Sequence, residues 1–340
     1  MLRAPDKLSR HRTEGNHVRI SDVDEAELLA RIGPYLPRGD ATRLGPGDDA
    51  AVVAAADGRF VVTTDVQVQD RHFRRDWSTG TDVGRRAAAV NFADVAAMGA
   101  RPTCLVTALV LPAQEEVDWV LQLARGLGQE CRRWGAGAVG GDLSGGPVVT
   151  VSVTAHGDLQ GRTPVLRSGA RPGDVLAHAG TLGFSAAGLA LLTAGVPAER
   201  IQGGQAAVRT YLCPDAPIAA GPAAARSGAH AMLDVSDGLL RDAGRMAAAS
   251  NVCLDLDGGA LARAAEQLAA PARECSLDPL RWILGGGEDH GLLAAFPPEV
   301  PLPHGFEPIG QVAAAPAGAV HVDGTAPATR EIGWEHFNRG

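Results

Sequence analysis

The stretch "GDLQGRTPVLRSGARPGD", residues 157–174, divides the chain into two halves. Gly, Pro and Arg dominate it, a composition typical of a junction and not of a helix or strand. On both sides of it, short apolar runs of strand type alternate with helical patterns. We therefore predict an α/β fold with two domains, residues 21–160 and 161–340. Residues 1–20 are predicted to be a disordered extension.

The composition excludes several classes of protein. A chain of 340 residues with 45% hydrophobic residues can bury a core in each of two domains. A formal charge of −8 argues against a nucleic-acid or anionic-membrane partner. No apolar run approaches the roughly 20 residues of a membrane span, and the basic N-terminus lacks the apolar region of a secretory signal. The five scattered cysteines lack CxxC spacing, which favours reduced thiols, a cytoplasmic location and no zinc site.

The lysine content limits how the protein could handle phosphates. Lys7, in the predicted extension, is the single lysine of the sequence. A P-loop requires a lysine after its glycines, and a Schiff-base enzyme requires one in its core. If this protein binds phosphates, metal ions or arginines must neutralise their charge.

The first half of the chain contains an acidic, glycine-rich segment, "GPGDDAAVVAAADGRFVVTTDVQ", residues 45–67. Residues 50–55 and 59–65 are rich in β-formers and are separated by Asp57-Gly58, a pattern that predicts a hairpin. The stretch "DVGRRAAAVNFADVAAMGA", residues 82–100, predicts an Ala-rich helix that ends at Gly99. Asp94 is an acidic residue on an otherwise small and apolar face of that helix.

Four clusters combine an apolar run with Asp and with a neighbouring Gly, hydroxyl residue or second Asp. They are residues 45–52, 61–65, 139–146 and 233–240, and Asp94 is a fifth carboxylate. Mg²⁺ prefers such oxygen ligands and commonly bridges to substrate phosphates. One cluster alone would be an ordinary turn. Asp94 could instead pair with Arg85 or Arg86, and Ser236-Asp237 could cap the following helix. Together, the five favour a phosphate site with several metal ions.

The same segments resemble the motif series of a known family. "GPGDDAAV", "TTD" followed by "RHF", "VNFADVAAMGA", "GGDLS", "RSGARPGD", "LDVSDGLL" and "GGGEDH" occur in that order. They are similar to the motifs of thiamine-monophosphate kinase, a family of the aminoimidazole ribonucleotide synthetase-like superfamily, from about residue 45 to residue 337. The resemblance implies a ferredoxin-like N-terminal domain that forms a homodimer, with nucleotide bound at that interface, and an α/β C-terminal domain.

The resemblance also implies an activity, the last step of thiamine diphosphate biosynthesis. The γ-phosphate of ATP would pass directly to thiamine monophosphate, without a phosphoenzyme. Because the acceptor phosphate is already largely ionised at neutral pH, no general base is required. The site must instead align two polyanions and neutralise them, which metal ions do. Several Mg²⁺ ions are expected as cofactors, with K⁺ as a further candidate.

The resemblance assigns roles to individual residues. The metal-binding positions are Asp49, Thr63, Thr64, Asp65, Asp94, Asp142, Asp234 and Asp237, of which Asp49, Asp65, Asp94, Asp142 and Asp237 are expected to be catalytic. The nucleotide-binding positions are Gly141, Asp142, Arg167 and Ser236. The positions that contact thiamine monophosphate are His72, Glu288 and Trp334. His290 departs from the family pattern, in which a Tyr is usual.

Two alternatives stay open at this point. One is an aminoimidazole ribonucleotide synthetase-like, ATP-dependent ligase, since its nucleotide and metal carboxylates are similar. The other is a non-catalytic, nucleotide-binding regulatory protein that has kept the fold. A selenophosphate synthetase is excluded, because it would need a reactive Cys near an N-terminal glycine loop and the first cysteine here is Cys104.

Overall fold

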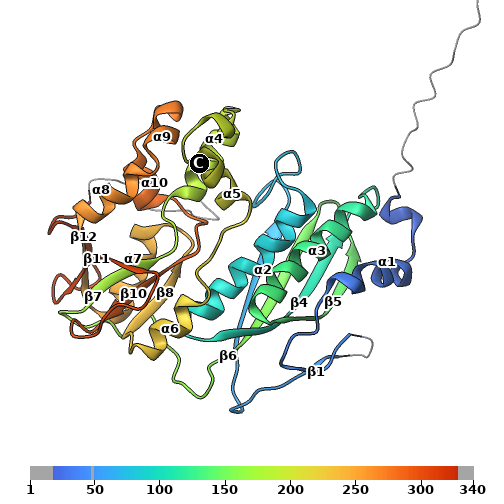
Figure 1. Ribbon diagram of the computed structural model, residues 1–340, viewed down its shortest axis with the longest axis horizontal. Helices are drawn as coiled ribbons and strands as arrows, with labels where there is room; N and C mark the ends of the chain where they lie inside the picture. The colour runs from blue at the N-terminus through green and yellow to red at the C-terminus, as the bar shows by residue number, and fades with distance from the viewer. Residues whose placement is uncertain (1–17, 47–49, 328–340) are drawn as a thin grey trace, which may run out of the picture.

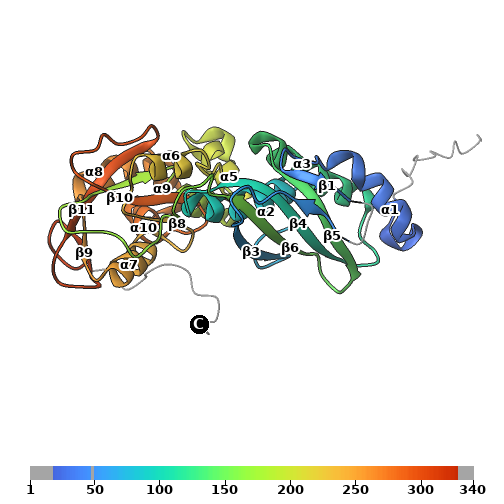
Figure 2. The same ribbon diagram turned by 90° about the horizontal axis from the view of Figure 1, so that it is seen from below.

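The computed structural model describes residues 18–46 and 50–327. Two sheets, each with its own helices, lie side by side along the longest axis of the molecule (Figures 1 and 2). The predicted α/β class is confirmed. The junction was predicted between residues 157 and 174, and the described chain passes there from the last strand of one sheet, which ends at Asp158, to the first strand of the other, which begins at Val175.

The N-terminal domain is built on a four-stranded sheet with the order β3-β6-β4-β5. Its strands are β3 (Val61–Val68), β4 (Arg101–Leu111), β5 (Gly137–Gly145) and β6 (Thr150–Asp158). Strand β4 pairs parallel with β5, and the other pairs are antiparallel. Helices α2 (Gly80–Ala97) and α3 (Val117–Trp134) pack on one face, and α1 (Glu25–Ile32) packs against α3. Short 3-10 turns cover Ile20–Asp22 and Gly33–Tyr35.

The predicted hairpin between residues 50–55 and 59–65 is wrong. Strand β2 (Val52–Val53) pairs with β1 (Thr42–Leu44), whereas β3 pairs along its whole length with β6. The Asp57-Gly58 turn exists, with Gly58 at a φ of 74°, but its two flanking strands belong to different sheets. The turn signal was local, and the eight-residue pairing with a distant strand decided the partner.

The C-terminal domain contains a six-stranded sheet with the order β12-β9-β11-β7-β10-β8. Its strands are β7 (Val175–Ala179), β8 (Ala231–Val235), β9 (Cys253–Leu256), β10 (Gly291–Phe296), β11 (Phe306–Ala313) and β12 (Val320–Val322). Its helices are α4 (Phe184–Ala194), α5 (Gly204–Leu212), α6 (Ala220–Arg226), α7 (Leu239–Ser250), α8 (Gly258–Glu266), α9 (Ala269–Cys275) and α10 (Pro279–Gly285), with a 3-10 turn at Ala198–Arg200. Among the described residues, no helix is both long and apolar enough to cross a bilayer.

Helix α2 joins the two domains. Fourteen of its eighteen residues are buried, which is far more than one amphipathic stripe would bury. It packs on β3 and β6 of its own domain and also contacts β8, β10 and α6 of the other (Figure 1). One hydrophobic core therefore contains Phe92 of α2 together with Met232 and Phe296 of the C-terminal sheet. Its small side chains let both domains approach its backbone.

The predicted N-terminal extension lies mostly outside the described residues, which begin at Val18. Where the chain is described, Ile20 donates its backbone N–H to the carbonyl of Glu115 at 2.8 Å, and Val117 donates to the carbonyl of Val18 at 2.9 Å. This short segment thus packs against the residues that precede α3.

Glycines set the distance between α2 and α3. A Cβ on Gly84 would lie 2.0 Å from the carbonyl oxygen of Leu123, and one on Gly126 would lie 2.2 Å from that of Thr81. Because real Cβ atoms do not approach backbone oxygens so closely, any larger residue would push the two helices apart. The position of α2, and with it that of Asp94, depends on this contact.

We expect Gly84→Val to reduce the free energy of unfolding by about 3 kcal/mol, because the new side chain meets the backbone of α3. Gly244→Ala in α7 is the matched control, because a Cβ there meets nothing within 4 Å. A helix gains about 0.5–1 kcal/mol from that replacement. Urea denaturation followed by circular dichroism measures both. A Gly84→Val protein as stable as wild type would contradict the close contact.

Candidate functional site

Strand β3 and helix α2 place three of the predicted metal-binding residues together. Side chains alternate along a strand, so Thr63 and Asp65 both point to the face that α2 covers. The hydroxyl of Thr63 donates to Oδ2 of Asp94 at 2.7 Å. The suggested ion pair of Asp94 with Arg85 or Arg86 is not formed. Arg85 pairs with Glu130 at 3.5 Å and Arg86 with Glu288 at 2.5 Å.

Thr64 and Asp142 lie on the opposite face of the same sheet. Thr64 pairs in register with Thr154, whose hydroxyl donates to that of Thr64 at 3.0 Å. Asp142 pairs with Ala108, which in turn pairs with Ser152 on this open face. Those of the predicted metal-binding residues that the structure describes are therefore divided between two faces of the sheet and do not form a single cluster.

The C-terminal domain brings a carboxylate, Asp234, to the α2 side of the sheet from the end of β8. Burial, then the charges of Asp234 and Asp65, raise the pKa of Asp94 to about 7. Burial also raises the pKa of Asp65, which Asp234 and Glu288 raise further and His290 opposes. Carboxylates that raise one another's pKa share a region with too little positive charge.

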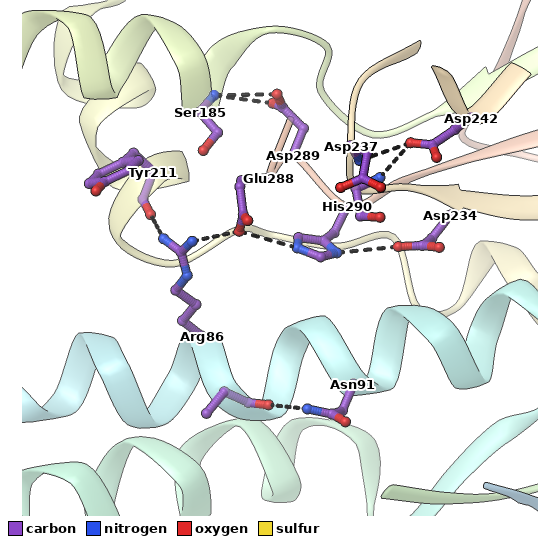
Figure 3. A network of polar contacts seen from close by, with 12 residues as sticks. Arg86, Asn91, Ser185, Tyr211, Asp234, Asp237, Asp242, Glu288, Asp289 and His290 are labelled. Atoms are coloured by element: carbon purple, nitrogen blue, oxygen red, sulfur yellow. Dashed lines mark hydrogen bonds and ion pairs between the residues drawn. The ribbon is translucent and has the colours of Figure 1, made fainter. Parts of the chain in front are cut away.

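The segment "GGGEDH", residues 285–290, turns one acid inward and directs two side chains toward α2 (Figure 3). Asp289 is buried and caps α4, because its Oδ1 accepts from the hydroxyl of Thr181 at 2.8 Å and the N–H of Phe184 at 3.1 Å. Glu288 and His290 have positive φ angles of 70° and 53°. Non-glycine residues adopt this region rarely, and the buried cap helps to hold them there.

Arg86, Glu288, His290 and Asp234 form a chain of alternating charge across the domain boundary (Figure 3). Nε2 of His290 lies 3.7 Å from Oε2 of Glu288, and Nδ1 lies 3.3 Å from Oδ2 of Asp234. Burial alone would lower the pKa of His290, but the two carboxylates outweigh it and raise the pKa to about 10. Burial would raise the pKa of Glu288, but Arg86 and His290 hold it well below its usual range.

His72 is the second of the predicted substrate residues, and it lies within electrostatic reach of Glu288. Its Nδ1 accepts the N–H of Val68 at 3.0 Å, which fixes the ring at the end of β3. The structure therefore brings His72 and Glu288 together from different domains. Trp334, the third substrate residue, lies outside the described residues, as does Asp49.

The loop between β8 and α7 carries Ser236 and Asp237. The suggestion that they cap α7 is wrong, because Gly238 is the N-cap and no side chain caps there. Instead, Oδ2 of the buried Asp242 accepts the N–H groups of Ser236 at 3.0 Å and Asp237 at 2.9 Å. Burial raises the pKa of Asp242 to about 6. Asp237 itself pairs with Arg245 at 2.5 Å.

Arg167 lies apart from Ser236, with which the resemblance groups it. Its backbone carbonyl accepts the hydroxyl of Ser250 at 2.9 Å, at the C-terminal end of α7. Ser236 precedes the N-terminal end of that twelve-residue helix, about 18 Å away along its axis. The side chain of Arg167 is exposed.

Two adjoining cavities border β5: one of about 490 Å³ extends over β4 and β6 to Phe60, and one of about 700 Å³ lies between β5 and helices α1 and α3. Both are lined by Gly140 and Gly141, and Asp142 lines the larger one. The fold itself requires glycine at position 141, because a Cβ there would lie 2.1 Å from the carbonyl oxygen of Thr107 on β4. The backbone of β5 is thereby accessible from these cavities.

The described part of the chain contains no group of three His, Cys, Asp or Glu side chains in metal-binding geometry. Asp48 and Asp49 lie outside that part. The donor set still fits a hard cation, because Thr63, Asp65, Asp94 and Asp234 supply only oxygen.

Four residues that hold the site, Arg86, His290, Asp242 and Asp289, were not predicted from the sequence as its partners. Asp289 had a signal, because an acid that follows Gly-Gly-Glu within an apolar setting needs a buried partner. Arg86 was considered only as a partner of Asp94, since the distance between α2 and Glu288 along the chain hides their contact.

The acidic cluster of Asp65, Asp94 and Asp234 predicts that the free energy of unfolding depends on pH. The pKa of Asp94 is about 7 in the folded state, above its ordinary 3.8. The protonated carboxyl therefore contributes fully to the free energy of unfolding below about pH 4, and this contribution is lost as the pH rises through 7. We expect Asp94→Asn to exceed wild type in free energy of unfolding by about 1–3 kcal/mol at pH 8 in EDTA, and by little at pH 4.5.

Urea unfolding at the two pH values measures this difference. Asp76→Asn is the control, because Arg74 lowers the pKa of the exposed Asp76 and its charge does not change in this window. An Asp94→Asn difference that is equal at both pH values would contradict the burial of a destabilised carboxylate.

Comparison with known proteins assigns the chain to a family. The family described as AIR synthase related protein matches with its N-terminal domain over residues 47–159 and its C-terminal domain over residues 171–301. Thiamine-monophosphate kinase from Mycobacterium tuberculosis is 51% identical over 86% of each chain. The crystal structure of thiamine monophosphate kinase from Aquifex aeolicus has a TM-score of 0.71 at 31% identity, covering 81% of this chain and 90% of its own.

A second structure with a TM-score of 0.71, also 31% identical and covering 85% of this chain and 91% of its own, is that of an enzyme complexed with AMPPCP and TMP. The similarity extends through both domains, and the identity to the curated relative is far above what a shared fold alone requires. The chain belongs to the thiamine-monophosphate kinase family.

Proposed function

We propose that this chain transfers the γ-phosphate of ATP to thiamine monophosphate, with Mg²⁺, to give thiamine diphosphate and ADP. The observation that carries the proposal is the acidic region between the domains. Asp65 and Asp94 from one domain lie near Asp234 from the other, and burial together with the neighbouring carboxylates raises the pKa values of Asp65 and Asp94. His72 and Glu288, the residues expected to contact the acceptor, adjoin the same region.

Direct transfer between two phosphates suits these residues. The acceptor oxygen of thiamine monophosphate is largely ionised at neutral pH, so the protein does not have to remove a proton from it. Bound Mg²⁺ would neutralise and align the two polyanions. The protein's own task is to hold carboxylates where cations are needed, and Thr63, Asp65, Asp94 and Asp234 are the described residues that would do so.

ATP would bind beside β5, the edge strand of the N-terminal sheet opposite to β3. The cavities beside β5 expose the backbone of Gly141 and the carboxylate of Asp142, and their volumes of about 490 and 700 Å³ accommodate a nucleotide. The relative complexed with AMPPCP, an ATP analogue, supports a nucleotide site in this fold. Ser236, Asp237 and Arg167 remain candidates for further nucleotide or metal contacts.

The ligase alternative shares the domain descriptions but not the activity of the curated relatives, which are kinases. The regulatory alternative is tested by turnover.

The five cysteines are free thiols, which supports the proposed cytoplasmic location.

The direct test is formation of thiamine diphosphate and ADP from ATP, Mg²⁺ and thiamine monophosphate, measured by chromatography. We expect wild type to form both products in equal amounts and EDTA to stop the reaction. Asp94→Asn should reduce kcat by at least about 100-fold, because a metal-binding charge is lost where the transition state carries most negative charge.

Asp76→Asn, an exposed acid outside the cluster, serves as the control and should stay within about twofold of wild type. If ATP binds and no product forms, the regulatory alternative is favoured. If another phosphorylated acceptor is used instead, the substrate assignment is wrong and the fold assignment stands.

The open face of the N-terminal sheet is the proposed homodimer interface. Phe60, Val62 and Val66 are 58%, 55% and 47% exposed there, on the face that α2 and α3 leave uncovered. Such a row of apolar side chains on a sheet favours a protein partner. A second copy placed there would also enclose Asp142 and Thr64.

We expect Val66→Glu to convert a dimer into a monomer in sedimentation velocity, because it buries a charge without a partner in the interface. Leu189→Glu is the matched control, since Leu189 is 41% exposed on α4 in the other domain. A dimer that survives Val66→Glu and dissociates with Leu189→Glu would place the interface on the C-terminal domain.

A further inference from the structure

The two carboxylate oxygens of Glu288 have different surroundings. Oε2 accepts from Nη2 of Arg86 at 2.5 Å and lies 3.7 Å from Nε2 of His290. Neither of these contacts involves Oε1, and the side chain is 39% exposed. Glu288 is thus held through Oε2, and its side chain points from the segment of residues 285–290 toward α2 (Figure 3).

Arg86 holds Glu288 by more than charge. The residue is 3% exposed, and its Nη1 donates to the backbone carbonyl of Tyr211 while Nη2 donates to Glu288. The guanidinium also lies 5.4 Å from the ring centre of Tyr211. A planar guanidinium that is fixed at two nitrogens has little freedom, so it defines where the carboxylate lies. A lysine could not make both bonds in these directions.

The charge of Glu288 is already compensated. Arg86 supplies a full buried counter-ion at hydrogen-bond distance. A carboxylate paired in this way is a poor counter-ion for a second cation, such as the thiazolium ring of thiamine. Its unoccupied lone pairs still accept hydrogen bonds, and the aminopyrimidine ring of thiamine carries an amino group that donates them.

We propose that Arg86 is a positioning residue that orients Glu288 as the hydrogen-bond acceptor for the aminopyrimidine ring of the acceptor substrate. The inference rests on the proposed function, because it takes thiamine monophosphate as the substrate. It separates recognition of the pyrimidine, by Glu288, from neutralisation of the phosphates, by the acidic region and its cations.

Arg85 provides the matched control. It precedes Arg86 on α2 and carries the same charge, but it pairs with Glu130 of α3. Arg86→Met and Arg85→Met therefore remove one positive charge from neighbouring positions of one helix, and only the first releases Glu288. Arg86→Lys is a milder variant that keeps the charge and loses the tether to Tyr211.

The first experiment is steady-state kinetics with each substrate varied. We expect Arg86→Met and Glu288→Gln each to raise KM for thiamine monophosphate at least tenfold and to leave KM for ATP within twofold. The double variant should be no worse than the poorer single variant, because both changes remove the same contact. Arg85→Met should match wild type. If KM for ATP rose as much as KM for thiamine monophosphate, or if the two effects multiplied in the double variant, the inference would be wrong. Arg86 would then only link the two domains.

The second experiment uses an acceptor in which the pyrimidine amino group is replaced by a carbonyl oxygen, oxythiamine monophosphate. We expect wild type to prefer thiamine monophosphate by at least tenfold in kcat/KM, and expect Glu288→Gln and Arg86→Met to lose that preference. Arg86→Lys should reduce the preference for thiamine monophosphate, and this variant tests the inference if Arg86→Met does not fold. A preference that persists in both Arg86 variants would overturn the inference. A wild type that phosphorylates neither acceptor would overturn the proposed function, and this inference with it.

Discussion

The burial of α2 between two sheets is the constraint on which the rest of the structure depends. Close backbone contact with α3, made possible by Gly84 and Gly126, holds one side of the helix. On the other side, Gly221 of α6 approaches so closely that a Cβ there would lie 2.0 Å from the carbonyl of Ala96. A helix fixed in this way can present Arg86 and Asp94 to the C-terminal domain without a flexible loop.

The two polar residues of α2 show how the protein uses this rigid position. Arg86 is satisfied by partners from the other domain, Tyr211 and Glu288. Asp94 accepts a hydrogen bond from Thr63, but burial and the charges of Asp234 and Asp65 outweigh that bond and the nearby His290, so its ionised form is costly. Stability is lost at the position where cations and phosphates are expected, which is a common relation between stability and function in active sites.

Buried acids also shape the loops around this region. Asp289 holds the start of α4 and Asp242 holds the turn before α7, each by accepting backbone N–H groups. Because Asp289 and Asp242 accept these backbone N–H groups, the side chains of neighbouring residues do not have to do so. Beside Asp289, Glu288 and His290 keep positive φ angles and face α2. The motif around residue 289 thus combines one structural acid, Asp289, with two side chains that face α2.

Much of the architecture and of the site could be predicted from the sequence, because the signals are local. The junction composition and the Ala-rich helix ending at Gly99 indicated two α/β domains, and the acidic clusters predicted a set of oxygen donors, of which Thr63 and Asp94 are in contact. The hairpin before β3 failed, since a turn cannot reveal that β3 prefers the distant β6. The capping role of Ser236-Asp237 failed because the backbone there is bonded by Asp242 instead.

The sequence by itself determined which residue types are present and, through periodicity, which of them share a helix face or a strand. Only the tertiary structure decided which carboxylates meet. Thr63 and Thr64 are adjacent in the chain, yet a strand sends them to opposite faces of the sheet. Arg86 and Glu288 are 202 positions apart and form an ion pair, because packing of α2 against the second domain brings them together. Charge and hydrogen bonding act over a few ångströms in space, and the fold alone sets those distances.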